Sequence, residues 1–369
     1  MKKIREELNT QINSKNNDIL NLMSNANNRT NNNITYSKNV FIPVTEICRN
    51  DCGYCAFKKD PNDENAIILK NPDEILETLK EAEKYNCKEA LFTMGEDADE
   101  EPKVQKELDK LGFNSMHEYI YNVCAMTLEE TSLLPHTNAG NFPYKTLKKL
   151  RKVNVSMGMM LESSSTRLME TVAHENSPGK NPFIRLKTIE NAGKLKIPYT
   201  TGLLIGIGES KEEIVDSLLE IKRLNDKYGH IQEIIIQNFT ISPSIRMKDY
   251  YEPSILDMIR TVSISKLLFK DDISIQVPPN LNMVTNQIFL LCGTDDWGGV
   301  SPLTEDYVNP TSPWPTFNQL EHLTNDAGFD LKERLAIYDK YINKDWIDSS
   351  IYDKVVELKN SINWLLIWS

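Results

Sequence analysis

The chain has 369 residues, of which 40% are hydrophobic, and a formal net charge of -11 at pH 7. This length is sufficient for one large domain or for two smaller ones. The acidic balance argues against nucleic acid or an anionic membrane surface as the main partner. The polar start "MKKIREELNTQINSKNND" and the lack of a long apolar run predict a cytoplasmic protein without signal peptide or transmembrane helix, so we expect no structural disulfides.

Residues 1–38 are rich in asparagine, whose side chain competes with regular structure through local hydrogen bonds. We therefore expect an irregular or weakly helical arm there. From residue 39 onward the hydrophobic pattern alternates between strands and helices. The expected strands span 39–45, 89–94, 132–137, 153–162, 197–208, 231–239 and 273–277, and the clearest helices span 71–85 and 181–195. The pattern of residues 310–369 predicts a helical extension.

Strands that alternate with helices in this way indicate βαβ units and a parallel sheet. A long series of such units favours a (β/α) TIM-type barrel, partial or complete. An open doubly wound sheet is the alternative, but no G-x-G-x-x-G motif follows the first strand. The predicted organisation is an N-terminal arm (1–38), a barrel domain (39–309) and a helical C-terminal extension (310–369).

Three of the six cysteines, Cys48, Cys52 and Cys55, lie close together in the spacing C-x3-C-x2-C. A structural zinc ion takes four protein ligands, and no histidine is near in sequence, although a distant fourth ligand is an alternative. A 4Fe–4S cluster held by three thiolates leaves one iron free to bind a substrate or cofactor. We therefore interpret the motif as a cluster site, with the aromatic Tyr54 beside its last cysteine.

This motif, placed directly after the first strand, resembles that of the radical S-adenosylmethionine (SAM) superfamily. The resemblance implies a barrel of the radical SAM type, a 4Fe–4S cluster, and SAM bound to the open iron through its amino and carboxylate groups. One-electron reduction then cleaves SAM to methionine and a 5'-deoxyadenosyl radical. Barrel active sites lie at the carboxyl ends of the strands, where further motifs occur in this chain.

The same resemblance assigns residues around SAM. Gly95 and Glu96, in "TMGE", match the motif that meets the methionine ammonium, and Glu162 matches an acid that binds the ribose hydroxyls. The remaining matches are Arg185 for the SAM carboxylate, Gly206 in "GLLIGIGE" for the adenine, and Gln237 and Asn238 beside the adenine. Each motif also has an ordinary structural explanation, such as a tight turn, a strand-ending glycine, a solvated salt bridge or an acid at a helix N-terminus.

A closer resemblance covers residues 34–315. The segments "LLPHTNAG", "IQVPPNL" and "CGTDDWGGVSPLTEDYVNP" are similar to those of the first-subunit family of 7,8-didemethyl-8-hydroxy-5-deazariboflavin (FO) synthase. The resemblance implies that a second subunit joins tyrosine to 5-amino-6-(D-ribitylamino)uracil. The first subunit then closes the central ring of this adduct and expels ammonia. The implied partners are subunit 2, the small-molecule substrate, and a low-potential electron donor such as ferredoxin or flavodoxin.

Candidate substrate-handling residues are Asp295, Asp296 and His136. The adjacent acids suit proton transfer or binding of ribityl hydroxyls, and His136, at the end of an expected strand, suits acid–base catalysis. A polar turn and a core histidine are the structural alternatives. For the whole chain, the alternatives are another aromatic-ligating radical SAM enzyme, such as a subunit 2-like or menaquinone-pathway enzyme, and a non-catalytic metal-binding scaffold.

Overall fold

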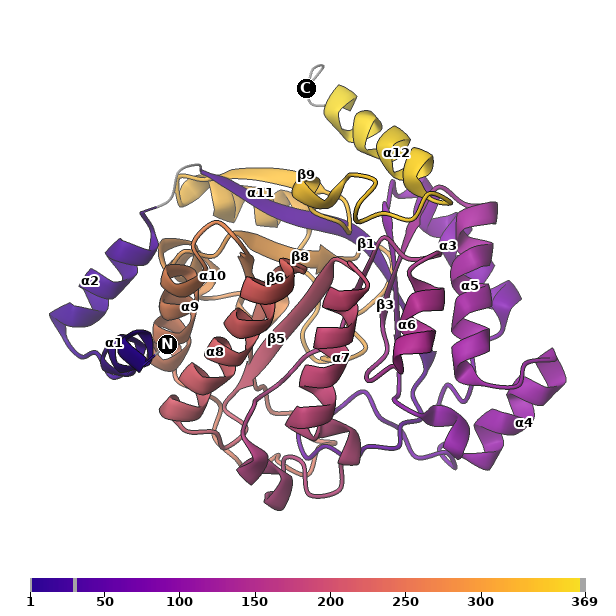
Figure 1. Ribbon diagram of the computed structural model, residues 1–369, viewed down its shortest axis with the longest axis horizontal. Helices are drawn as coiled ribbons and strands as arrows, with labels where there is room; N and C mark the ends of the chain where they lie inside the picture. Colours follow the sequence, from indigo (N-terminus) through magenta and orange to yellow (C-terminus); the bar gives the residue numbers. More distant parts are fainter. Residues whose placement is uncertain (1, 29–31, 366–369) are drawn as a thin grey trace.

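The computed structural model, which describes residues 2–28 and 32–365, contains a closed parallel barrel (Figure 1). Its strands are β1 (Asn33–Thr45), β2 (Glu89–Met94), β3 (Leu134–Asn138), β4 (Ser156–Gly158), β5 (Tyr199–Ile205), β6 (Ile231–Asn238), β7 (Ser274–Gln276) and β8 (Asp296–Val300). Neighbouring strands in the chain pair in parallel, and β1 pairs with both β2 and β8, which closes the ring. The predicted TIM-type barrel is therefore confirmed in its complete form.

Helices cover the outside of the barrel. They are α3 (Pro72–Lys84), α4 (Pro102–Leu111), α5 (Met116–Glu130), α6 (Tyr144–Leu150), α7 (Pro182–Lys194), α8 (Lys211–Tyr228), α9 (Ile255–Phe269) and α10 (Asn286–Leu291). Local sequence starts several of them. The side chains of Ser210 and Glu213 form a reciprocal capping box at α8, and the Asn71 and Asn181 side chains accept backbone N–H groups at α3 and α7. Apolar side chains between strands and helices form the main core, as at Ile75, Val215 and Ile234.

The N-terminal segment is more regular than expected. It forms helices α1 (Lys2–Ile12) and α2 (Asn17–Ala26), which pack against α8 and α9 (Figure 1). Leu8, Ile12, Ile19 and Leu22 are buried in this contact. The helical spacing of these few apolar residues outweighs the asparagine content. In addition, β1 begins at Asn33, so the expected boundary between residues 38 and 39 falls within a strand.

The C-terminal extension contains helices α11 (Phe317–Asp326) and α12 (Tyr352–Leu365), as expected, but also a strand, β9 (Asp330–Arg334). This strand pairs in parallel with the first residues of β1, outside the closed ring (Figure 1). The chain then crosses the amino end of the barrel, where the carbonyl of Ala336 accepts hydrogen bonds from Ser156 of β4 and Gln232 of β6. The extension therefore closes the bottom of the barrel. Within the described residues, no helix is long and apolar enough to cross a membrane.

Candidate active site

A cavity of about 330 Å³ occupies the interior of the barrel. Most of the residues predicted from the sequence line it: Cys48, Cys52, Tyr54, Cys55, Gly95, Glu96, His136, Glu162, Arg185, Gln237 and Asn238. Gly206, Asp295 and Asp296 are not among the described residues that line it. The fold thus brings the cysteine motif and most of the SAM motifs to one space, although these segments lie far apart in the sequence.

The cysteine loop follows β1 directly and is held in a defined conformation. The backbone N–H of Glu96 donates to the Cys48 sulfur over 3.3 Å, and the N–H of Gly53 donates to the Ala173 carbonyl over 3.1 Å. Gly95 permits this close approach, because a Cβ there would lie 1.8 Å from the Ile47 carbonyl oxygen. The loop therefore depends on glycine at the position that the sequence motif contains.

The three cysteines are free thiols that face the cavity. Burial raises the pKa of Cys48, and it raises the pKa of Cys55 to about 12, so bound metal is needed to hold these sulfurs as thiolates. Among the described residues, no three His, Cys, Asp or Glu side chains converge on a single-ion site. The three cysteine thiols suit a 4Fe–4S cluster, whose separate iron atoms each take one thiolate.

Arg185 and Glu96 lie at the carboxyl end of the barrel with unsatisfied polar atoms. The Arg185 side chain is 4% exposed, and its Nε and Nη1 have no hydrogen-bond partner within the described part of the chain. Its Nη2 lies 3.8 Å from Oε2 of Glu96, an oxygen that also lacks a hydrogen-bond partner among the described residues. Buried polar groups are rarely left unpaired in native proteins. This pair therefore fits a zwitterionic ligand, with a carboxylate for Arg185 and an ammonium for Glu96.

Glu162 is buried and has a φ of 65°, which is unfavourable for a non-glycine residue. Its Oε1 lies 2.6 Å from the ammonium of Lys180. Burial acts to raise the pKa of Glu162, but Lys180 and Arg185 outweigh it, so the net pKa is lowered and the group is a carboxylate. Lys180 also lines the cavity and was missed by sequence reasoning, because nothing in the surrounding "SPGK" marks it.

The remaining SAM-motif residues lie in the cysteine loop and at or just after strand ends. Tyr54 places its hydroxyl 3.0 Å from Nε2 of His174, and Asn238, which ends β6 beside Gln237, accepts from Asn282 over 2.8 Å. Gly206 follows β5 with a φ of 98°, and its N–H donates to Glu209 over 2.7 Å. This glycine shapes the turn behind the cavity and does not line it.

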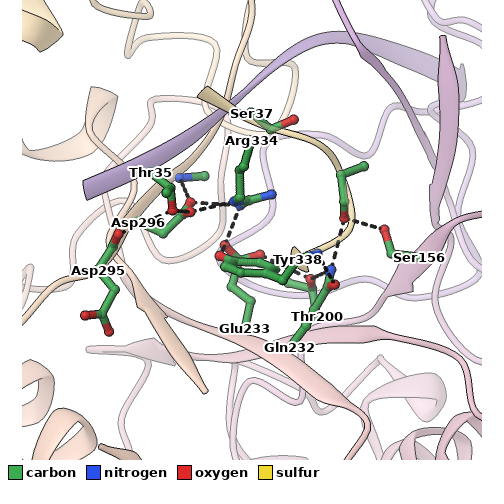
Figure 2. A network of polar contacts seen from close by, with 12 residues as sticks. Thr35, Ser37, Ser156, Thr200, Gln232, Glu233, Asp295, Asp296, Arg334 and Tyr338 are labelled. Carbon is green, nitrogen blue, oxygen red and sulfur yellow. Dashed lines mark hydrogen bonds and ion pairs between the residues drawn. The ribbon is translucent and has the colours of Figure 1, made fainter. Parts of the chain in front are cut away.

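The adjacent acids Asp295 and Asp296 separate to opposite sides of the barrel wall, because successive residues of a strand point to opposite faces. Asp295 points away from the interior (Figure 2), toward Lys266 of α9 at 2.9 Å. Asp296 is fully buried and binds Arg334 of β9 through both carboxylate oxygens, over 2.5 and 2.8 Å. The two carboxylates therefore do not converge on one point of the cavity, in contrast to our interpretation of them as an acid pair.

His136 does reach the cavity, from β3. The hydroxyl of Ser156 donates to the Ala336 carbonyl, so it accepts from Nδ1 of His136 over 2.7 Å. Nδ1 therefore carries the proton, and Nε2 is an acceptor. Burial, assisted by Arg334, lowers the pKa of His136 to about 3, which keeps the ring neutral near neutral pH. A neutral acceptor suits ligand binding better than proton exchange at that pH.

A buried polar network around Arg334 was not predicted (Figure 2). Its Nη2 donates to Oε1 of Glu233 over 2.8 Å, and Tyr338 donates to the same oxygen over 2.9 Å. Thr200 donates to the other oxygen of Glu233 over 3.1 Å. Burial raises the pKa of Glu233 to about 7, with Arg334 acting in the opposite direction. These contacts join residues far apart in the chain, so no local pattern could have revealed them.

Comparison with known proteins agrees with this architecture. Residues 42–221 match the model of the radical SAM superfamily. The FeFe-hydrogenase maturase HydG from Carboxydothermus hydrogenoformans has a similar fold, with a TM-score of 0.72 at 17% identity, covering 100% of this chain and 89% of that one. Methylornithine synthase (PylB) aligns with a TM-score of 0.63 at 18% identity, covering 97% and 92%. A complete parallel barrel with a three-cysteine loop at its carboxyl end, together with this match, defines a radical SAM enzyme, a class that binds a 4Fe–4S cluster and SAM.

More similar relatives specify the family. The 7,8-didemethyl-8-hydroxy-5-deazariboflavin synthase of Methanobrevibacter smithii is 67% identical over 331 residues, covering 89% of this chain and 98% of that one. The synthase of the same name from Methanocaldococcus jannaschii is 54% identical over 325 residues, covering 88% and 89%. The chain belongs to the 7,8-didemethyl-8-hydroxy-5-deazariboflavin synthase family.

Proposed function

We propose that this enzyme converts the adduct of tyrosine and 5-amino-6-(D-ribitylamino)uracil, 5-amino-5-(4-hydroxybenzyl)-6-(D-ribitylimino)-5,6-dihydrouracil, into FO with loss of ammonia. The observation that carries the proposal is the cavity, which extends from the cysteine loop to the buried polar side chains inside the barrel. Such a shape accommodates a second molecule beneath SAM, shielded from water that would quench a radical. The 67% identity to a protein named 7,8-didemethyl-8-hydroxy-5-deazariboflavin synthase supports FO as the product.

In this proposal Cys48, Cys52 and Cys55 ligate the cluster. Arg185 binds the SAM carboxylate and Glu96 its ammonium, which would satisfy the atoms that have no partner in the protein. Glu162 binds the ribose hydroxyls, in competition with its ion pair to Lys180. When bound, the cluster and SAM supply a 5'-deoxyadenosyl radical that removes one hydrogen atom from the substrate. Tyr54, Gly95, Gly206, Gln237 and Asn238 shape the pocket around SAM.

The adduct loses one hydrogen atom to 5'-deoxyadenosine and returns one electron to the donor, and ring closure releases ammonia and a proton. SAM is consumed as methionine and 5'-deoxyadenosine, so the products balance the substrates. The proposed partners are a subunit 2 homologue that supplies the adduct and a low-potential donor such as ferredoxin or flavodoxin. Because the sequence has one C-x3-C-x2-C motif, we assign only one radical step to this chain.

Anaerobic turnover of the reconstituted enzyme tests this function. With the preformed adduct, SAM and a reductant, we expect fluorescent FO together with 5'-deoxyadenosine and ammonia. With tyrosine and 5-amino-6-(D-ribitylamino)uracil in place of the adduct, we expect no FO until a subunit 2 homologue is added. FO made from these precursors by this chain alone, or an adduct left untouched while SAM is cleaved, would contradict the proposal.

A further inference from the structure

The deep end of the cavity is a ring of polar side chains contributed by six strands. Its members are Asn39, Glu89, His136, Thr200, Glu233 and Gln276, and all of them line the cavity. Arg334 closes the ring from below, carried by β9 and fixed by Asp296 (Figure 2). We call these seven residues the polar floor. Each is less than 9% exposed, so the floor is shielded from bulk solvent.

Two glycines of β8 make room for the amides of this floor. A Cβ on Gly299 would lie 2.2 Å from Nδ2 of Asn39, and a Cβ on Gly298 would lie 2.0 Å from Nε2 of Gln276. Oδ1 of Asn39 is buried and has no hydrogen-bond partner among the described residues, and Asn39 lines the cavity. Because buried polar atoms are rarely left unpaired, this acceptor suits a donor group of a ligand. The "GG" of the motif "DDWGG" therefore makes room for the floor.

An apolar belt separates the floor from the SAM residues. Phe41, Leu91, Ile235 and Pro278 line the cavity two residues after Asn39, Glu89, Glu233 and Gln276, respectively. Residues i and i+2 of a strand point to the same face, so the belt lies one layer nearer the carboxyl end. Two residues beyond Ile235, Gln237 lies at the end of β6. From top to bottom the cavity is therefore polar, mainly apolar and polar again, with Asn138, two residues after His136, as the polar member of the middle layer.

We propose that the polar floor is a polyol subsite, which binds the ribityl chain of the substrate while the belt holds its hydroxybenzyl and uracil rings below SAM. This inference rests on the proposed function. A polyol hydroxyl is both a donor and an acceptor, and the floor offers both: carboxyl oxygens and an imidazole nitrogen accept, a guanidinium donates, and the amides do either. Glu89, Glu233 and the adjacent Asp296 disfavour an anionic group such as a phosphate.

The layers also account for the orientation of the substrate. A ring system placed in the floor would leave the Asn39 acceptor and its neighbours without partners, at a cost of about 1–3 kcal/mol for each buried group. A polyol chain placed in the belt would lose its own hydrogen bonds to water against apolar side chains. The orientation with rings toward SAM also brings the bonds that change nearest to the carboxyl end, where the cysteines lie.

Product binding gives a test that does not depend on radical chemistry. Reconstituted enzyme is titrated with FO and with the 10-methyl deazaflavin that lacks the ribityl chain, following their fluorescence. We expect wild type to prefer FO at least tenfold. Asn39→Ala and Gln276→Ala should each weaken FO binding by about tenfold, the effect of one lost hydrogen bond, and leave the methyl analogue unchanged. Lys38→Ala is the matched control, because Lys38 neighbours Asn39 but stacks on Phe317 outside the cavity.

The assay separates this inference from the proposed function. If wild type converts the adduct to FO but binds both deazaflavins equally, the polyol subsite is wrong and the function stands. Equal weakening of both ligands in Asn39→Ala and Gln276→Ala, in protein that still binds SAM, overturns the subsite in the same way. If wild type makes no FO from the adduct, the proposed function fails and the subsite fails with it.

Discussion

Replacement of Arg334 by leucine should strongly destabilise the protein, although this residue lies in the C-terminal extension. The guanidinium donates to both oxygens of Asp296 and to Glu233, and it lies 4.3 Å from the centre of the Tyr338 ring. The side chains of Asp296 and Glu233 are 0% and 6% exposed, so water cannot replace the lost cation. Removal of one partner of a buried ion pair costs about 3–5 kcal/mol, a large fraction of the 5–15 kcal/mol by which proteins of ordinary stability are folded.

The decrease in the free energy of unfolding caused by Arg334→Leu should grow as pH rises. Burial already raises the pKa of Glu233 to about 7 against the opposing effect of Arg334, and loss of the arginine raises it further. A carboxyl with a raised pKa binds its proton more tightly in the folded state, so its contribution to stability falls as pH rises toward the folded pKa. The free energy of unfolding lost in Arg334→Leu relative to wild type should therefore be larger at pH 8.5 than at pH 5.5. The difference should be about 1.4 kcal/mol for each unit by which the substitution further raises the folded-state pKa of Glu233.

Urea unfolding of both proteins at these two pH values measures the effect. Arg223→Leu is the matched control, because Arg223 forms an exposed pair with Glu220 on α8 and should lose less than about 1 kcal/mol at either pH. The reasoning would be refuted if Arg334→Leu unfolded within about 1 kcal/mol of wild type at pH 8.5. An equal deficit at the two pH values would show that Glu233 does not depend on Arg334.

Further predictions concern the cofactors and the acid at the barrel wall. Cys48→Ala should abolish the EPR signal of the reduced cluster, and an intact signal would remove Cys48 from the ligand set. Glu96→Gln and Glu162→Gln should each weaken SAM binding by about tenfold to a hundredfold with the cluster retained, because each loses a charge-assisted hydrogen bond; unchanged affinity in both would refute these roles. Asp295→Asn should form FO at close to the wild-type rate, since Asp295 faces Lys266. A large loss of turnover would indicate that Asp295 takes part in the reaction.

The sequence was sufficient for the barrel and for the loop that follows its first strand. Both depend on local features. These are alternating apolar runs, helix caps such as Ser210, and three cysteines in the loop that follows β1. Such signals survive in a single sequence because neighbouring residues carry them. The resemblance to radical SAM enzymes assigned Arg185 and Glu96. The structure adds that both residues line one cavity and that each has polar atoms without a hydrogen-bond partner among the described residues.

The ion pairs between residues far apart in the chain could not be predicted from the sequence. Arg334 contacts Glu233 across 101 positions of the chain, and Lys180, in the loop before α7, contacts Glu162 across 18 positions. Neither pair has a spacing that marks it. The separation of Asp295 from Asp296 was not predicted for a different reason. Adjacent residues of a strand face opposite sides, so recognition of β8 would have separated them.

The motif "DDWGG" supports the site through ion pairs, hydrogen bonds and close packing. Asp295 ties β8 to a lysine of α9, and Asp296 fixes the arginine that closes the barrel from below. Trp297 donates its indole N–H to Thr324 of α11 and so secures the C-terminal extension that carries this arginine. Gly298 and Gly299 then leave space for the two amides of the floor. The segment that marks the family in the sequence is therefore the one that builds the floor of its cavity, and a change at Asp296, Gly298 or Gly299 should alter the deep end of the cavity before it alters the cluster.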